Sequence, residues 1–123
     1  MADVDEVLHI SDRDGVKLVR LRTGSVRSEA EVEALGRGLM SAAEVPGQRM
    51  VLSFLGVEQL TSLVLGQLIR VHKRLAESAG EIRLADIDPQ IYEVFVITHL
   101  DRLFKIFDRE DEAVASFLGG AEA

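Results

Sequence analysis

The chain has 123 residues, of which 47% are hydrophobic and 28% are charged, as is typical of one globular domain. It contains no run of 18 apolar residues and no secretory leader, so we expect a cytoplasmic protein without a membrane anchor. The 21 acidic and 14 basic residues give a net charge of −7, which opposes direct nucleic-acid binding. The absence of cysteine excludes disulfides, thiolate metal sites and cysteine nucleophiles.

The first segment, residues 6–22, predicts a β-hairpin. Val7, Leu8 and Ile10 form a short apolar strand, and Asp14-Gly15 is a pair favoured in tight hairpin turns. The return strand, residues 16–22, changes its apolar alternation between Leu18 and Val19. This change indicates either a bulge or a strand that is partly covered on both faces.

A first helix is expected from about residue 29 to residue 44. Ser28 and Glu31 have the spacing of a capping box, and Pro46-Gly47 ends the helical pattern. Gly36 and Gly38 lie inside this pattern, and no Gly-Lys-Ser/Thr follows them. We therefore interpret them as positions of close packing rather than as a phosphate-binding loop.

The central stretch, residues 50–79, predicts a strand buried on both faces and then a helix. Apolar residues between Met50 and Leu55 run without alternation. From Leu65 onward, helical spacing predicts a core face. Its members are Leu65, Leu68, Ile69, His72, Leu75, Ala76 and Ala79.

Thr61 and Ser62 lie where this helix should begin. With Thr61 as the N-cap, Leu60 can pack on Leu65 as a hydrophobic staple. Ser62 is then the first helical residue, and its hydroxyl is not needed to cap the helix. A phosphate there would face the positive end of the helix dipole, although a serine or threonine at a helix start commonly serves only as a cap.

The C-terminal third predicts a second buried strand over residues 81–87 and a helix that starts with Asp88 as cap and Pro89 at N1. Ile91, Val94 and Phe95 mark the core face of that helix. A closing strand follows at residues 103–107. A last helix, capped within residues 108–111, should dock Val114, Phe117 and Leu118 on the core, before a frayed tail at residues 119–123.

The order β-β-α-β-α-β-α-β-α predicts an α/β fold: a single domain over residues 1–123, with its core at about 6–118. We expect a mixed sheet of four to five strands with an N-terminal hairpin and about four helices. Functional loops gather at the carboxyl ends of parallel strands, so the turns at residues 59–62 and 86–89 should share one edge. Simpler structural roles for the two aspartates there are that Asp88 caps a helix and Asp86 ends a strand.

Enzymatic activity is not expected. His9, His72 and His99 lack metal-ligand spacing, and His72 fits a residue at the boundary of the core. The sequence contains no nucleophile elbow, paired catalytic carboxylates or nucleotide motif, so we expect no metal and no cofactor. A small-molecule pocket under the sheet edge stays open as an alternative.

Residues 51–75 resemble the signature of the STAS domain of bacterial anti-sigma-factor antagonists. In that family a strand ending in Asp-Leu-Ser-Gly leads to Asp-Ser-Ser-Gly-Leu-Gly at the start of a helix. The corresponding residues here are Ser53-Phe54-Leu55-Gly56 and Thr61-Ser62-Leu63-Val64-Leu65-Gly66. The segments 79–84, 88–95 and 100–107 also resemble the family, so the likeness covers residues 49–117 well and the first 45 only in layout.

The resemblance implies an anti-sigma-factor antagonist that binds an anti-sigma factor with serine kinase activity. Phosphorylation of the motif's first serine, Ser62 here, would release it, and a phosphatase would reset it. The family's acidic residue before that serine is Thr61 here, and its second serine is Leu63. The partner-binding residues we expect are Leu55, Glu58, Gln59, Thr61, Leu63, Gln67, Asp86 and Asp88.

Two other functions are compatible with the same resemblance. The chain could be a scaffold subunit of a larger stress-signalling assembly, or a STAS domain that has lost the phosphorylation switch. We expect a monomer or a weak homodimer in each case.

Overall fold

A computed structural model describes residues 3–22, 26 and 28–119 of the chain. The predicted tail at residues 120–123 lies outside the described residues. The elements are α1 (Val4–Val7), β1 (Leu8–Arg13), β2 (Val16–Leu21), α2 (Glu29–Ala42), β3 (Arg49–Ser53), α3 (Ser62–Ala76), β4 (Glu81–Ala85), α4 (Pro89–Ile97), η1 (Leu100–Arg102), β5 (Ile106–Phe107) and α5 (Glu110–Phe117).

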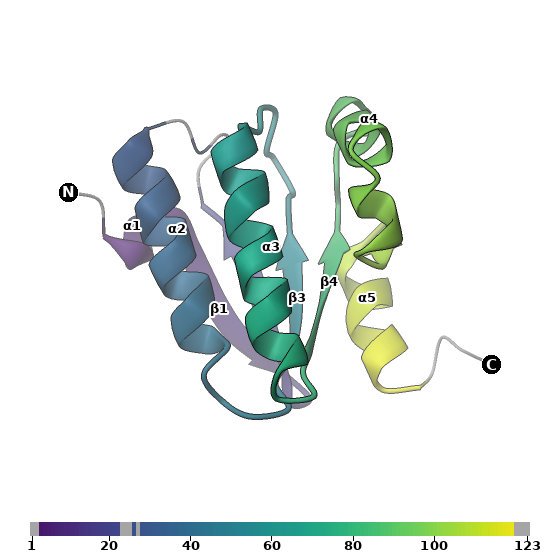
Figure 1. The fold of residues 1–123 in the computed structure, drawn as a ribbon. Coiled ribbons are helices and arrows are strands. Elements are labelled where there is room, and N and C mark those ends of the chain that lie inside the picture. Colours follow the sequence, from purple (N-terminus) through teal and green to yellow (C-terminus); the bar gives the residue numbers. More distant parts are fainter. Residues whose placement is uncertain (1–2, 23–25, 27, 120–123) are drawn as a thin grey trace.

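Within the described residues, the sheet has five strands in the order β1-β2-β3-β4-β5. The β1–β2 pair is antiparallel, and the other pairs are parallel. Each parallel pair is joined through a helix, so β3 and β4 both end at the same edge of the sheet, as the sequence predicts. Figure 1 shows α2 and α3 side by side across one face of this sheet.

The sheet separates two hydrophobic clusters. The larger cluster joins the sheet to α2, α3 and α4, and includes Leu35, Leu52, Leu68 and Phe95. The smaller cluster lies on the other face, where Val114 and Phe117 of α5 pack on β2, β3 and β4. This arrangement explains why the inner strands read as continuous apolar runs.

The hairpin closes through Asp14-Gly15, both with positive φ, and its register runs unbroken from Leu8↔Leu21 to Arg13↔Val16. The phase change between Leu18 and Val19 is therefore no bulge. Both side chains are fully buried, each in a different cluster. Of the two predicted explanations, a strand covered on both faces is therefore the correct one.

The N-terminal strand begins later than predicted. Val7 ends the short helix α1, which has no counterpart among the predicted elements, and the strand starts at Leu8. A Cβ at Gly38 of α2 would overlap the side chains of Leu8 and Val4, and one at Gly36 would overlap Gln67. The two glycines therefore permit close packing, as predicted, and the Ser28–Glu31 capping box is present.

The buried face of α3 is rotated from the predicted one. Val64 and Val71 are buried with Leu68 and Leu75. Leu65, Ile69 and His72 are only half-buried, and Ala76 and Ala79 are exposed. The apolar residues cover a wide arc of this helix, so spacing alone does not decide which edge of the arc meets the core. His72 lies at the boundary, edge-on to Phe104 at 5.4 Å between ring centroids.

The closing strand is shorter than predicted. His99 adopts a left-handed conformation (φ 63°) before η1, and the strand covers only Ile106 and Phe107. Phe104 turns into the main core, whereas Leu103 is 41% exposed. The last helix docks through Val114 and Phe117 as predicted, but Leu118 is 48% exposed and does not dock.

Candidate functional site

A tight turn after β3 projects Leu55 into solvent. The backbone N–H of Val57 donates to the carbonyl of Phe54, and Gly56 at the third position has φ 83°, as a type II turn requires. Phe54 and Val57 are buried and anchor the two ends of the turn, whereas Leu55 is 67% exposed. The predicted strand therefore ends at Ser53, and Leu55 is a turn-tip residue.

The start of α3 has the predicted arrangement. Thr61 is the N-cap, and its Oγ1 accepts from the Val64 N–H at 3.4 Å. Ser62 is the first helical residue and is exposed. Within the described part of the chain the Ser62 hydroxyl makes no hydrogen bond. Leu63 follows with 57% of its surface exposed, so an apolar side chain stands in solvent beside a free hydroxyl.

The loops after β3 and β4 meet at one edge, as predicted. A surface depression there is lined by Glu58 and Gln59 from the first loop and by Asp88, Pro89 and Gln90 from the second. Asp88 is the N-cap of α4, and its Oδ1 accepts from the Gln90 N–H at 2.9 Å. Asp88 therefore caps a helix, which is the simpler structural role predicted for it. It is also exposed at this edge.

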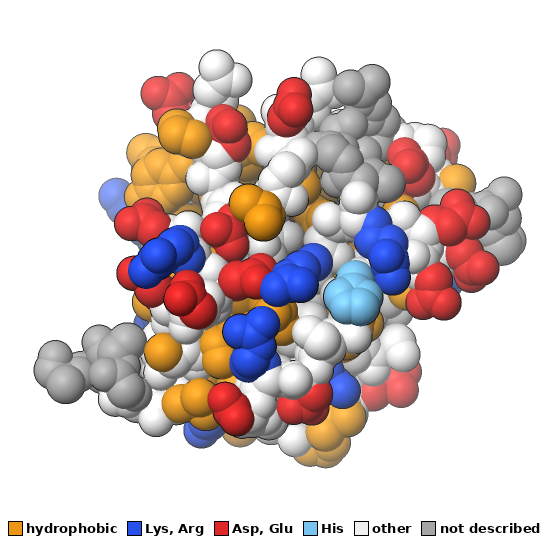
Figure 2. Space-filling model, turned by 180° about the vertical axis from the view of Figure 1, so that it is seen from behind, with side chains coloured by type: hydrophobic (Ala, Val, Ile, Leu, Met, Phe, Trp, Pro, Cys, Tyr) orange, Lys and Arg blue, Asp and Glu red, His pale blue; other side chains and the backbone are white. Residues whose placement is uncertain are grey.

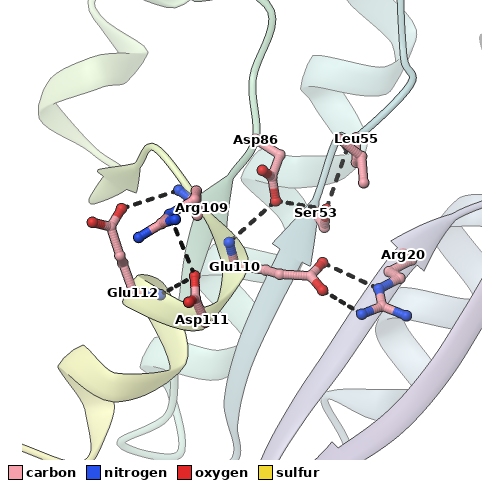
Figure 3. A network of polar contacts seen from close by, with 8 residues as sticks. All are labelled: Arg20, Ser53, Leu55, Asp86, Arg109, Glu110, Asp111 and Glu112. Atoms are coloured by element: carbon pink, nitrogen blue, oxygen red, sulfur yellow. Dashed lines mark hydrogen bonds and ion pairs between the residues drawn. The ribbon is translucent and has the colours of Figure 1, made fainter.

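A polar network under this edge ties the ends of three elements together (Figure 3). The Ser53 hydroxyl donates to Asp86 Oδ2 at 3.2 Å and accepts from the Leu55 N–H at 3.3 Å. Asp86 Oδ2 also accepts from the Glu110 N–H at 3.1 Å, at the first residue of α5. Asp86 thus joins the turn that carries Leu55 to the start of a helix on the other face of the sheet.

The network extends to β2 through an ion pair. Arg20 donates from Nε to Glu110 Oε2 at 3.1 Å and from a terminal nitrogen to Oε1, a two-point contact. The α5 N-cap position is Arg109, whose N–H donates to the Glu112 carboxylate at 3.2 Å. The predicted cap within residues 108–111 is confirmed in position, because Arg109 is the N-cap and Asp111 Oδ1 accepts from the Glu112 N–H at 3.0 Å. Asp86 and Glu112 supply two further acceptors at this helix start.

The pKa values of two carboxyl groups in the network shift in opposite directions. Burial raises the pKa of Asp86, and repulsion from Glu110 adds to this effect, while the hydrogen bond from Ser53 opposes it. The hydrogen bonds from Arg20 lower the pKa of Glu110 against the opposing effect of burial. Glu110 is thus the stable anion of the pair.

The predicted partner-binding residues and the predicted phosphoacceptor Ser62 divide into an exposed group and an inward group. The exposed group comprises Leu55, Glu58, Gln59, Ser62, Leu63 and Asp88. Thr61, Gln67 and Asp86 are half-buried. Gln67 lies against Gly36 in the groove between α2 and α3, and Asp86 belongs to the network. We call the exposed group the Ser62 surface.

Sequence reasoning missed the parts played by Arg20 and Glu110, and treated Ser53 only as a replacement for the family's aspartate. The two ionic partners are 90 positions apart, so no local pattern joins them. The available signal is weak, because the apolar strand Val16–Leu21 contains two half-buried cations, Lys17 and Arg20, and its pattern does not show which of them has an ionic partner.

The described residues form neither a metal cluster nor a membrane-spanning helix. In residues 3–22, 26 and 28–119, no three His, Asp or Glu side chains are grouped so that they could hold a metal ion. No helix in the same ranges combines the length and apolar character that crossing a bilayer requires.

Comparison with solved structures supports the fold. A STAS-domain anti-sigma-factor antagonist protein of Planctomyces limnophilus superposes with a TM-score of 0.81 at 24% identity, covering 94% of this chain and 98% of that one. SpoIIAA of Bacillus in its phosphorylated form superposes with a TM-score of 0.68 at 18% identity, covering 89% of this chain and 98% of that one.

Sequence comparison gives the family. BtrV of Bordetella bronchiseptica is 27% identical over 104 residues, which cover 85% of this chain and 88% of the relative. Its name gives an inferred role as an anti-sigma factor antagonist. The model of the STAS domain family matches residues 12–113. The chain therefore belongs to the STAS domain family.

Proposed function

We propose that this protein is an anti-sigma factor antagonist that binds a serine kinase serving as the anti-sigma factor and is released when Ser62 is phosphorylated. The observation that carries the proposal is the exposed, unbonded hydroxyl of Ser62 between an N-cap and an exposed leucine. The names of BtrV and of the Planctomyces protein support the class of partner.

Ser62 lies where the fold can accept a phosphate group that is added and later removed. An added phosphate carries about −1.5 to −2 charges near pH 7 and would lie at the positive end of α3, beside backbone N–H groups. Thr61 already caps the helix, so modification of Ser62 removes no hydrogen bond from the fold. The modified chain should therefore stay folded.

The same charge would oppose docking. Leu63 and Leu55 are 57% and 67% exposed, and a partner that covers them must remove water from the surface around Ser62. Desolvating a phosphate there is costly unless the partner supplies cations. We infer that the unmodified chain occupies the kinase and frees a sigma factor, and that a phosphatase restores this state.

The direct test is intact-mass measurement with peptide mapping after incubation with ATP and the candidate anti-sigma kinases of the same organism. One added phosphate on Ser62 is the expected result. Thr61→Val should keep this acceptor, whereas Ser62→Ala should abolish labelling. Labelling of another residue, or none with any kinase, would overturn the assignment.

Binding measurements test the switch itself. Ser62→Ala should fold at a cost of no more than ~1 kcal/mol and should keep kinase affinity, because Thr61 is the cap. Ser62→Asp should also fold, since a negative charge is tolerated at this helix end, but its affinity should fall by at least ~10-fold, about 1.4 kcal/mol. Equal affinity of wild type and both variants, by calorimetry, contradicts the mechanism.

Gly66 offers a second test that separates stability from binding. It lies one helical turn after Ser62, is exposed, and has open space where a Cβ would stand. Gly66→Ala should therefore stabilise the free chain by ~0.5–1 kcal/mol through helix propensity. If the kinase packs closely on this turn, the added methyl group should weaken binding. Unchanged affinity in the stabilised variant would exclude close packing at Gly66.

A further inference from the structure

The tip of the turn after β3 is not fixed by side-chain packing. Leu55 is 67% exposed, and a Cβ added at Gly56 would meet no atom within 4 Å. The two buried ends of the turn are fixed by backbone bonds. The Phe54 N–H donates to the Ala85 carbonyl and the Val57 N–H donates to the Phe54 carbonyl, both at 2.9 Å. The orientation of Leu55 therefore depends on what its own backbone binds.

The Leu55 backbone is bound by Ser53. The Ser53 side chain is fully buried, and its Oγ accepts from the Leu55 N–H at 3.3 Å. A serine hydroxyl that bonds the backbone two residues later fixes a local turn. A β-turn itself bonds only its first carbonyl and its fourth N–H, which leaves the N–H of the second residue, here Leu55, without a partner inside the turn. Ser53 supplies that partner.

Asp86 in turn fixes the orientation of the Ser53 hydroxyl. The hydroxyl donates to Asp86 Oδ2 at 3.2 Å, which leaves the Oγ lone pairs available to the Leu55 N–H (Figure 3). Asp86 adopts a left-handed conformation, φ 58°, that is uncommon outside glycine and persists only where surrounding contacts stabilise it. One such contact comes from the Glu110 N–H at 3.1 Å.

The far end of this chain of hydrogen bonds is anchored on β2. Glu110 makes the two-point contact with Arg20, and the Glu110 side chain is only 17% exposed. Figure 2 shows acidic and basic side chains next to one another on the face of the sheet that α5 covers. The start of α5 is thus held by ionic and polar contacts, and through Asp86 and Ser53 these contacts extend to the turn that carries Leu55.

We propose that Ser53, supported by Asp86, is a positioning residue that orients Leu55 for docking to the kinase. This role rests on the proposed function, in which the kinase covers Leu55. A side chain that is already held in its docking orientation loses less conformational freedom on binding than one on a loose turn. Ser53 is fully buried and touches no partner, so its whole effect on binding passes through Leu55.

The first test is calorimetry of kinase binding. Ser53→Ala should weaken binding by ~5-fold, the usual net effect of one hydrogen bond. The matched control is Ser116→Ala. Ser116 is also buried, and its hydroxyl also makes two bonds, accepting from Arg83 and donating to the Ala113 carbonyl at 2.6 Å each. It lies beside Arg49, at the opposite end of β3 from Ser53. Ser116→Ala should destabilise the fold at least as much, by urea denaturation, and leave kinase affinity unchanged.

A double-mutant cycle separates positioning from general loosening of the fold. If Ser53 acts through the Leu55 side chain, Ser53→Ala should cause no further loss of affinity in a Leu55→Ala background. General loosening would instead cause the same loss in both backgrounds. Asp86→Asn should bind like the wild type, because an asparagine carbonyl can accept from the Ser53 hydroxyl. Asp86→Ala should weaken binding as Ser53→Ala does.

A measurement on the free chain needs no kinase. Amide exchange followed by NMR should show faster exchange of the Leu55 N–H in Ser53→Ala and no change in Ser116→Ala. Unchanged exchange, unchanged affinity of Ser53→Ala, an equal loss in Ser116→Ala, or the same loss with Leu55→Ala would each overturn the positioning role and leave the proposed function standing. A wild type that binds no kinase would overturn the proposed function, and with it the docking role of Leu55.

Discussion

Replacing Phe95 by alanine should lower the free energy of unfolding by ~3–5 kcal/mol, the usual range for deleting a buried aromatic ring. Phe95 is fully buried in the main core on α4. Its ring contacts Phe54 and Phe104 edge-to-face, with centroid distances of 6.3 and 6.5 Å. The substitution removes both contacts and leaves a cavity between α4 and the sheet, which urea denaturation followed by circular dichroism would measure.

The same substitution should reach the Ser62 surface through Phe54. Phe54 anchors one end of the turn that exposes Leu55, so losing its ring partner should loosen that turn and weaken kinase binding even where the protein stays folded. Val45→Ala is the matched control, because Val45 is 54% exposed and its loss should change stability by less than ~0.5 kcal/mol. A Phe95→Ala cost below ~1 kcal/mol would show that the core closes around the deletion.

The helix starts were predictable because capping is local. Thr61, Asp88 and Ser28 each accept a hydrogen bond from a backbone N–H two or three residues later, so the residue type and its spacing contain the needed information. The position of Ser62 at N1 followed from Thr61. The pairing of the β3 and β4 loops also followed from the order of elements, since both strands are parallel and end at one edge.

Contacts between distant elements were not predictable in the same way. The start of α5 takes one of its acceptors from Asp86, 24 positions earlier, in addition to the local acceptors Asp111 and Glu112. The apolar run at residues 103–107 gave no sign that Phe104 enters the core below α4 while Leu103 stays outside. In the structure the left-handed residue His99 and the 3-10 helix η1 come directly before this run.

Asp86→Ala should lower the free energy of unfolding by ~1–3 kcal/mol, whereas Asp86→Asn should stay within ~1 kcal/mol of wild type. The alanine leaves the Ser53 hydroxyl and the Glu110 N–H without their acceptor. It also occupies a left-handed backbone position, φ 58°, that asparagine adopts more readily. An asparagine carbonyl can accept both bonds. Denaturation of the three proteins near pH 7 measures the difference.

The difference in unfolding free energy between wild type and Asp86→Asn, measured as a function of pH, tests the direction of the Asp86 pKa shift. Folding raises the pKa of Asp86, so the folded state favours the protonated carboxyl. The contribution of Asp86 to stability is therefore fully present below its unfolded pKa of about 3.9 and is lost as the pH rises through its folded pKa. Asparagine does not titrate, so the variant should gain stability relative to wild type over that interval and keep the gain up to neutral pH.

Glu110 acts in the opposite direction and is present in both proteins. Its pKa is lowered by Arg20, so it contributes stability above its unfolded pKa that is lost as the pH falls through its folded pKa. Taking the difference between wild type and Asp86→Asn largely cancels this common effect. An advantage of the asparagine variant that grows toward acid pH would mean that Asp86 is held as an anion, and that the Ser53 and Glu110 hydrogen bonds outweigh its burial.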